Sequence, residues 1–81
     1  MDIDATNLYN INDISDKMIE ETIKEVYLAL EERGYKPINQ LVGYLMSGDS
    51  GYISSYKDSR NKIRQIDRSK IIEILLKNYI K

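Results

Sequence analysis

The chain has 81 residues, a formal net charge of −1 and 42% hydrophobic residues. This length suits a single small domain, and the slightly acidic balance argues against a nucleic-acid binder, whose binding surface is normally basic. The sequence contains neither histidine nor cysteine, which removes the commonest general base, the soft metal ligands and any disulfide. We therefore predict a protein that is not an enzyme, with no catalytic residues, no metal site and no cofactor.

A chain this short has a core that is marginal by itself. Without a disulfide or a zinc site, self-association is the common remaining means of stabilisation. We therefore expect a homodimer, with the apolar faces of the second and last predicted helices as the best candidates for its interface. The sequence does not open with a secretory signal, and its apolar runs are far shorter than a membrane span. These features predict a cytoplasmic protein with no membrane contact.

The N-terminal part of the sequence predicts a tail followed by a helix. Residues 1–13 are acidic and rich in Asp and Asn without a sustained period, which is typical of a flexible tail. Residues 14–81 form the predicted helical domain. Ser15 or Asp13 can cap its first helix, whose apolar face recurs at helical spacing, and Gly34 is placed to close it in a left-handed conformation. That apolar face consists of Ile19, Ile23, Val26, Tyr27 and Leu30.

A second helix is predicted to begin at Pro37 and to end near Ser47, where Gly48 follows as the next left-handed glycine. Its apolar residues indicate a short buried helix: Ile38, Leu41, Val42 and Leu45. Asp49 then begins a loop or short helical turn.

The C-terminal third predicts two more helices. Asp58 is expected to cap one that carries Ile63 and Ile66, and Asp67 or Ser69 to cap the last, which has a broad apolar stripe. No run alternates with period two for long enough to indicate a strand. The predicted fold is all-α, a compact bundle of four or five short helices.

A local basic segment stands out in this acidic chain. Arg60, Arg64 and Arg68 are spaced four apart, so on a continuous helix they would form a row suited to binding carboxylates or phosphates. An interruption at Asp67 or Ser69 would move Arg68 out of line. The alternative interpretation is an exposed face with ion pairs to nearby acids. Thr6, within the predicted tail, is accessible to a kinase.

Several segments together resemble the IreB/ReoM family of small bacterial regulatory phosphoproteins over about residues 15–80. The resemblance rests first on the run Gly34-Tyr35-Lys36-Pro37-Ile38-Asn39-Gln40-Leu41-Val42-Gly43-Tyr44, followed by Ser47-Gly48-Asp49. It continues through Asp58-x-Arg60-x-x-Ile63-Arg64 and Arg68. The sequence departs from many relatives at Ser50-Gly51, where they have Pro-Ala.

The resemblance implies a cytosolic helical homodimer that is a substrate of a PASTA-domain serine/threonine kinase and of its phosphatase. Family members restrain peptidoglycan synthesis when unphosphorylated, by promoting ClpCP-dependent turnover of MurA, and so affect tolerance of cell-wall antibiotics. Thr6, in Asp4-Ala5-Thr6-x-x-Tyr9, matches the phosphoacceptor position. We expect Arg60, Arg64 and Arg68 to bind a partner, such as the Clp protease machinery or an adaptor, or the phosphorylated tail itself.

Two other function classes fit the sequence less well. The second helix, the turn after it and the basic segment are compatible with a small helix-turn-helix DNA-binding regulator, although the acidic balance counts against it. A purely structural dimerisation module would show no kinase labelling.

Overall fold

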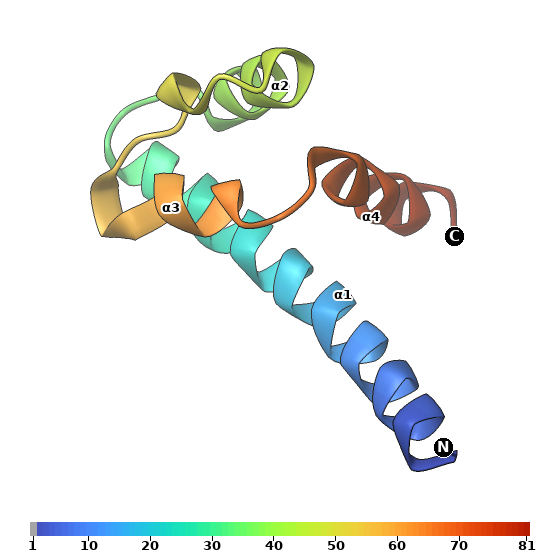
Figure 1. The fold of residues 1–81 in the computed structure, drawn as a ribbon. Coiled ribbons are helices and arrows are strands. Elements are labelled where there is room, and N and C mark those ends of the chain that lie inside the picture. The colour runs from blue at the N-terminus through green and yellow to red at the C-terminus, as the bar shows by residue number, and fades with distance from the viewer. Residues whose placement is uncertain (1) are drawn as a thin grey trace.

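The computed structural model describes the backbone of residues 2–81 and the side chains of residues 16–81. Over residues 2–81 the chain is all-helical without a strand, as predicted. Four α-helices follow one another, and Figure 1 shows the last three gathered around the C-terminal part of the long first one. They are α1 (Asp2–Glu32), α2 (Pro37–Ser47), α3 (Ser59–Arg64) and α4 (Arg68–Ile80), with the 3-10 turns η1 (Ser50–Tyr52) and η2 (Tyr56–Asp58) between α2 and α3. Over residues 2–81, none of the helices combines the length and the hydropathy that a membrane span requires.

The first helix begins earlier than the sequence predicted. The expected cap was Ser15 or Asp13, whereas α1 begins at Asp2 and continues through both residues. The cap prediction is wrong because Ser and Asp side chains also occur inside helices and do not by themselves end one. The flexibility predicted for residues 1–13 stays a prediction, and the side chains of this segment lie outside the described residues.

The two glycine-ended turns are confirmed. Gly34 has φ +83°, and the bonds from its N–H to Glu31 O (3.0 Å) and from Tyr35 N–H to Leu30 O (3.0 Å) form a Schellman motif that ends α1. Gly48 has φ +77° and donates to Tyr44 O over 2.7 Å, which ends α2. Pro37 occupies the first turn of α2, where its missing N–H costs no hydrogen bond.

The core lies where α2, α3 and α4 meet the C-terminal half of α1. It joins buried residues from all four helices and from the segment after η1, which explains why such a short chain has one continuous core. Its buried members are Ile19, Val26, Leu30, Tyr44, Ile53, Ile63, Ile71 and Ile74.

The prediction of a buried second helix is only partly right. Tyr44 is buried and Leu41 and Leu45 pack against the core, but Ile38 and Val42 are exposed. The periodicity correctly identified an apolar face on α2, but the neighbouring elements cover only part of that face. The same holds for α4, where two isoleucines are buried and most other apolar residues are exposed.

The start of α3 has an unusual backbone. Lys57 and Asp58 have φ values of +53° and +61°, a left-handed conformation that costs a non-glycine residue about 1 kcal/mol or more. Asp58 does occupy the position before α3, but its side chain makes no capping bond to the backbone, so that predicted role is wrong. Its Oδ1 instead accepts from Asn61 Nδ2 at 2.9 Å. Asp67 likewise precedes α4 without a side-chain cap.

Candidate functional site

The three predicted arginines do not form one row. Arg60 and Arg64 lie on α3, which ends at Arg64, and Arg68 is the first residue of α4. The segment 65–67 between the two helices changes the chain direction, so the expected continuous row is interrupted before Arg68. The structure therefore keeps Arg60 and Arg64 on one helix, one turn apart, and separates Arg68 from them.

Arg60 is anchored to the backbone of the preceding loop. Its Nε–H donates to Ile53 O at 2.9 Å, and its backbone N–H donates to Ser54 O at 3.1 Å. Ile53 is fully buried, so this bond fixes the stem of the arginine against the core. A guanidinium has five N–H donors, and Nε–H is one of them. This hydrogen bond therefore holds the guanidinium group in place while the N–H donors of Nη1 and Nη2 are left for an anion.

Arg68 has a structural role at the end of α2. Its Nη1 donates to Leu45 O at 3.0 Å, one of the last carbonyls of α2, which have no partner within the helix. A cation at a helix C-terminus is also favoured by the helix dipole. The guanidinium covers Gly48 so closely that a Cβ there would lie 2.8 Å from Arg68 Cζ. This bond connects α4 to α2, and no pattern in the sequence predicts it.

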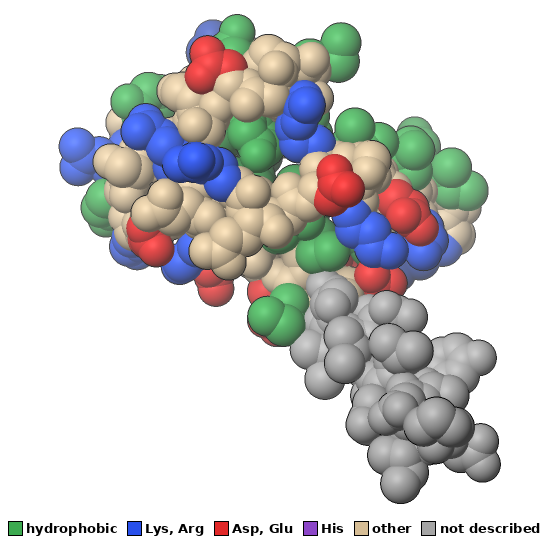
Figure 2. All heavy atoms as spheres, in the orientation of Figure 1, with side chains coloured by type: hydrophobic (Ala, Val, Ile, Leu, Met, Phe, Trp, Pro, Cys, Tyr) green, Lys and Arg blue, Asp and Glu red, His purple; other side chains and the backbone are tan. Residues whose placement is uncertain are grey.

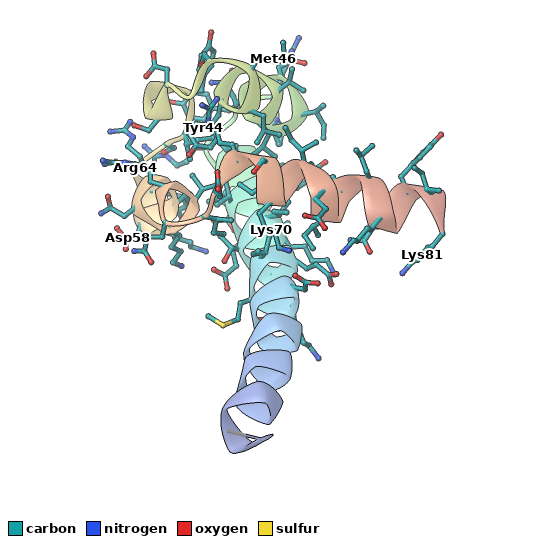
Figure 3. The ribbon with its side chains drawn as sticks, turned by 45° about the vertical axis from the view of Figure 1, so that its right-hand side comes forward. Tyr44, Met46, Asp58, Arg64, Lys70 and Lys81 are labelled. Atoms are coloured by element: carbon teal, nitrogen blue, oxygen red, sulfur yellow. The ribbon has the colours of Figure 1, made fainter. Side chains whose placement is uncertain are left out.

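Arg64 is the exposed member of the three. Figure 3 places it on the side of α3 that is turned away from α4. Its side chain forms no hydrogen bond or ion pair with the other described side chains, residues 16–81. Figure 2 shows blue side chains gathered over α3 with few acidic ones among them. Arg60 and Arg64 therefore stay together on α3 among other basic side chains, whereas Arg68 binds the end of α2.

A polar cluster that sequence reasoning missed lies at the other end of α3. The Tyr56 hydroxyl donates to Glu32 Oε1 at 3.0 Å, and Lys57 Nζ lies 3.2 Å from the same oxygen. The Tyr56 bond, followed by the Lys57 contacts, lowers the pKa of Glu32 below its ordinary value. Arg33 stacks over the Tyr56 ring at 5.1 Å from its centroid. These contacts join the end of α1 to η2 and hold the left-handed turn that begins α3.

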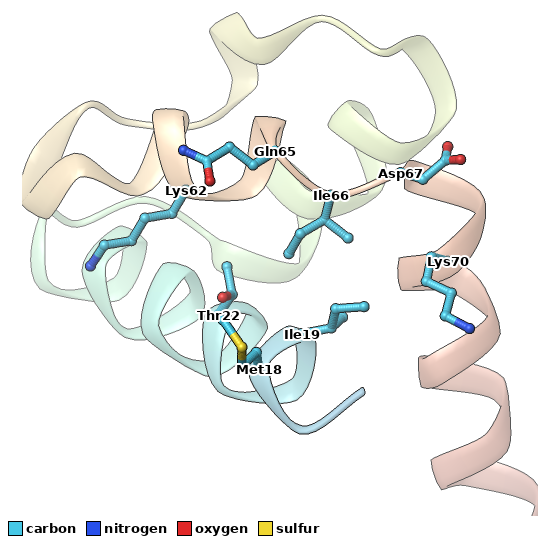
Figure 4. Close-up of a pocket in the computed structure, with 8 residues that line it drawn as sticks. All are labelled: Met18, Ile19, Thr22, Lys62, Gln65, Ile66, Asp67 and Lys70. Carbon is cyan, nitrogen blue, oxygen red and sulfur yellow. The ribbon is translucent and has the colours of Figure 1, made fainter. Parts of the chain in front are cut away.

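A hollow of about 510 Å³ lies where α3 leads into α4 (Figure 4). Its apolar wall faces two lysines, but both have acidic partners. Lys62 Nζ lies 3.2 Å from Glu25 Oε1, and Lys70 Nζ lies 3.7 Å from Asp16 Oδ1. These ion pairs connect α3 and α4 to α1, so both lysines contribute to contacts between helices. The hollow is lined by Met18, Ile19, Thr22, Lys62, Gln65, Ile66, Asp67 and Lys70.

Thr6, the predicted phosphoacceptor, has its side chain outside the described residues, so its surroundings stay a prediction. Among the described residues there is no group of three or more acidic side chains placed to hold a metal ion.

The comparison with protein families agrees with the resemblance seen in the sequence. The model of the family described as IreB regulatory phosphoprotein matches residues 4–81. This match includes the Thr6 segment, both glycine-ended turns and all three arginines, and so covers nearly the whole chain. The chain therefore belongs to the IreB family of regulatory phosphoproteins.

Proposed function

We propose that this protein is a cytoplasmic switch that controls peptidoglycan synthesis and is set by phosphorylation of Thr6. The unphosphorylated form promotes ClpCP-dependent turnover of MurA and so restrains synthesis, and a PASTA-domain kinase relieves this restraint. A phosphatase restores the restraint, and the extent of Thr6 phosphorylation alters tolerance of cell-wall antibiotics. The family match over residues 4–81, which contains Thr6, carries this proposal.

Arg60 and Arg64 supply the surface on which the switch acts. Their guanidinium groups bind an acidic segment of the Clp machinery or of an adaptor. Phosphorylation of Thr6 adds a charge of about −1.5 to −2 and three acceptor oxygens, which suits it to compete for the same two arginines. The exposure of Arg64 and the anchored stem of Arg60 support this choice over Arg68, whose guanidinium binds Leu45 O.

The phosphorylation step is tested by incubating the protein with the purified kinase domain and ATP. Intact-mass spectrometry with site mapping should find one phosphoryl group, on Thr6, and the Thr6→Ala variant should stay unlabelled. Thr22 is the other threonine of the sequence, so Thr22→Ala is the matched control and should be labelled normally. Full labelling of Thr6→Ala would show that Thr6 is the wrong acceptor.

The binding surface is tested in cells by charge reversal at Arg64. Arg64→Glu should abolish the restraint on MurA level, and Arg64→Lys, which keeps the charge, should retain most of it. Circular dichroism should show the same helical content in both, because Arg64 is exposed. Normal MurA turnover with Arg64→Glu would place the partner surface elsewhere.

A further inference from the structure

The hollow between the end of α3 and the start of α4 has apolar walls. Figure 4 shows Ile66 on one side of it and Ile19 and Met18 on the other. Ile19 is a core residue that is only 7% exposed, and Ile66 packs against the same core. The fold therefore holds these two isoleucines in place. The volume of about 510 Å³ lies within the ~300–1,000 Å³ that is typical of binding pockets.

The mouth of the hollow is bordered by side chains that can adapt to a ligand. Met18 is 57% exposed, and its unbranched thioether side chain can fit partners of different shape. Lys62 and Gln65 are exposed as well. A side chain can therefore enter between Ile19 and Ile66 while the backbone that carries it stays outside. This arrangement suits a segment of another protein.

Lys70 places a positive charge beside the apolar walls. Its Nζ lies 3.7 Å from Asp16 Oδ1 and 3.6 Å from Glu73 Oε1, which is longer than the roughly 2.7–3.2 Å of an N–H···O hydrogen bond. Glu73 is held more closely by Lys77, at 3.1 Å. Exposed ion pairs contribute little to stability. A carboxylate from a partner can therefore bind the ammonium group of Lys70 at low cost.

The other charged side chains that line the hollow are directed elsewhere. Lys62 Nζ lies 3.2 Å from Glu25 Oε1, within hydrogen-bond distance. Figure 4 shows the carboxylate of Asp67 turned away from the two isoleucine walls. Lys70 is therefore the cation of this hollow that is best placed to pair with a carboxylate at its edge.

We propose that the hollow binds a short acidic segment of a partner protein through one large apolar side chain. That side chain, such as a leucine, lies between Ile19 and Ile66, and a neighbouring Asp or Glu of the segment pairs with Lys70. Burial of the apolar side chain supplies most of the affinity, and the ion pair adds specificity. The lining of the hollow includes neither Arg60 nor Arg64, so this is a second contact surface.

The test uses the full chain, isotopically labelled for NMR, and the peptide acetyl-Gly-Glu-Leu-Glu-Gly-amide as the probe. Titration with this peptide should give saturable shifts of the amide signals of Ile19, Thr22 and Ile66. The peptide with alanine in place of leucine should bind at least about 10-fold more weakly, because it lacks the apolar side chain. The peptide with glutamine in place of both glutamates should bind about 2–5-fold more weakly, because it cannot form the ion pair.

Two matched pairs of variants locate the peptide on the protein. Met18→Glu brings a like charge to the mouth and should weaken binding at least about 5-fold. Leu28→Glu is its control, because Leu28 lies on the same helix with a similar exposure of 53% but outside the hollow. In Lys70→Gln the glutamate and glutamine peptides should bind equally, since the ion pair is already lost. Lys24→Gln, at an exposed lysine outside the hollow, should preserve the difference between the two peptides.

The amide spectrum of each variant shows whether it folds like the parent, and the two pairs are independent tests. The proposal is overturned if the leucine peptide at millimolar concentration shifts no signal of the hollow, or if the alanine peptide binds equally well. Shifts centred on Arg60 and Arg64, or equal weakening by Leu28→Glu, would also overturn it. Hollow signals that move with the concentration of the protein alone would assign the hollow to a second copy of the chain instead. None of these results contradicts phosphorylation of Thr6, which kinase labelling reports separately.

Discussion

Replacing Arg68 with methionine should destabilise the fold by about 1–2 kcal/mol, whereas the same change at Arg64 should be nearly neutral. Methionine has a similar length and helix propensity to arginine but has no donor. A hydrogen bond from a charged group contributes about 1.5–3 kcal/mol, and the partial exposure of Arg68 reduces this. Loss of the bond also leaves Leu45 O, at the end of α2, without its partner.

The assay is thermal and urea unfolding of Arg68→Met, Arg64→Met and the parent at one fixed protein concentration, because the homodimer expected from the resemblance would make the midpoint depend on concentration. For a domain of this size, Arg68→Met should lower the melting temperature by about 4–16 °C, at roughly 4–8 °C per kcal/mol. Arg64→Met should change the free energy of unfolding by less than about 0.5 kcal/mol. Equal destabilisation by the two variants would refute the distinction drawn between the arginines.

Three further predictions concern other contacts of the fold. Gly43→Ala should destabilise the protein by about 1–3 kcal/mol in urea unfolding, because the new Cβ would lie 2.5 Å from Tyr52 Cε1; an unchanged midpoint would mean that the ring moves freely. Ile63→Ala, in the core, should cost about 2–5 kcal/mol by the same measurement, and a loss below 1 kcal/mol would contradict its full burial. The pKa of Glu32 is lowered in the folded state, first by its hydrogen bond from Tyr56. The ionised carboxylate therefore stabilises the fold above the ordinary pKa of 4.5, and this stabilisation is lost as the pH falls through the lowered pKa of the folded state. Tyr56→Phe should therefore show a shallower loss of stability than the parent as the pH falls from neutral to below 4.5, and parallel pH profiles would argue against this bond.

The local features of the fold could be predicted from the sequence because local rules determine them. Gly34 and Gly48 end their helices in a left-handed conformation that other residues adopt at a cost, and Pro37 suits only the first turn. Lys57 and Asp58 adopt the same left-handed conformation without a glycine. Their turn combines local bonds, such as Ser59 Oγ to Tyr56 O at 2.7 Å, with contacts distant in sequence, such as the Tyr56 hydroxyl to Glu32 Oε1 at 3.0 Å. The distant contacts cannot be predicted from a local sequence pattern.

The division of roles within the site could not be predicted, because it depends on where the folded chain brings backbone carbonyls. The sequence identified Arg60, Arg64 and Arg68 as a group by their spacing. Only the fold shows that Arg60 donates a hydrogen bond to Ile53 O and that Arg68 donates one to Leu45 O. Similarly, periodicity located an apolar face on α2 but could not show that the neighbouring helices leave part of that face uncovered.

The different anchoring of the arginines favours a particular mode of anion binding. An acidic segment that bound Arg68 would compete with Leu45 O and so weaken the link between α2 and α4. Binding at Arg60 has no such cost, because its anchor uses only Nε–H and holds the terminal fork in place, which reduces the entropy lost on binding. Residues four apart on a helix lie about 5–6 Å from each other, so one phosphate or one pair of carboxylates can contact both Arg60 and Arg64. A switch based on charge at α3 therefore leaves the connection between α2 and α4 undisturbed.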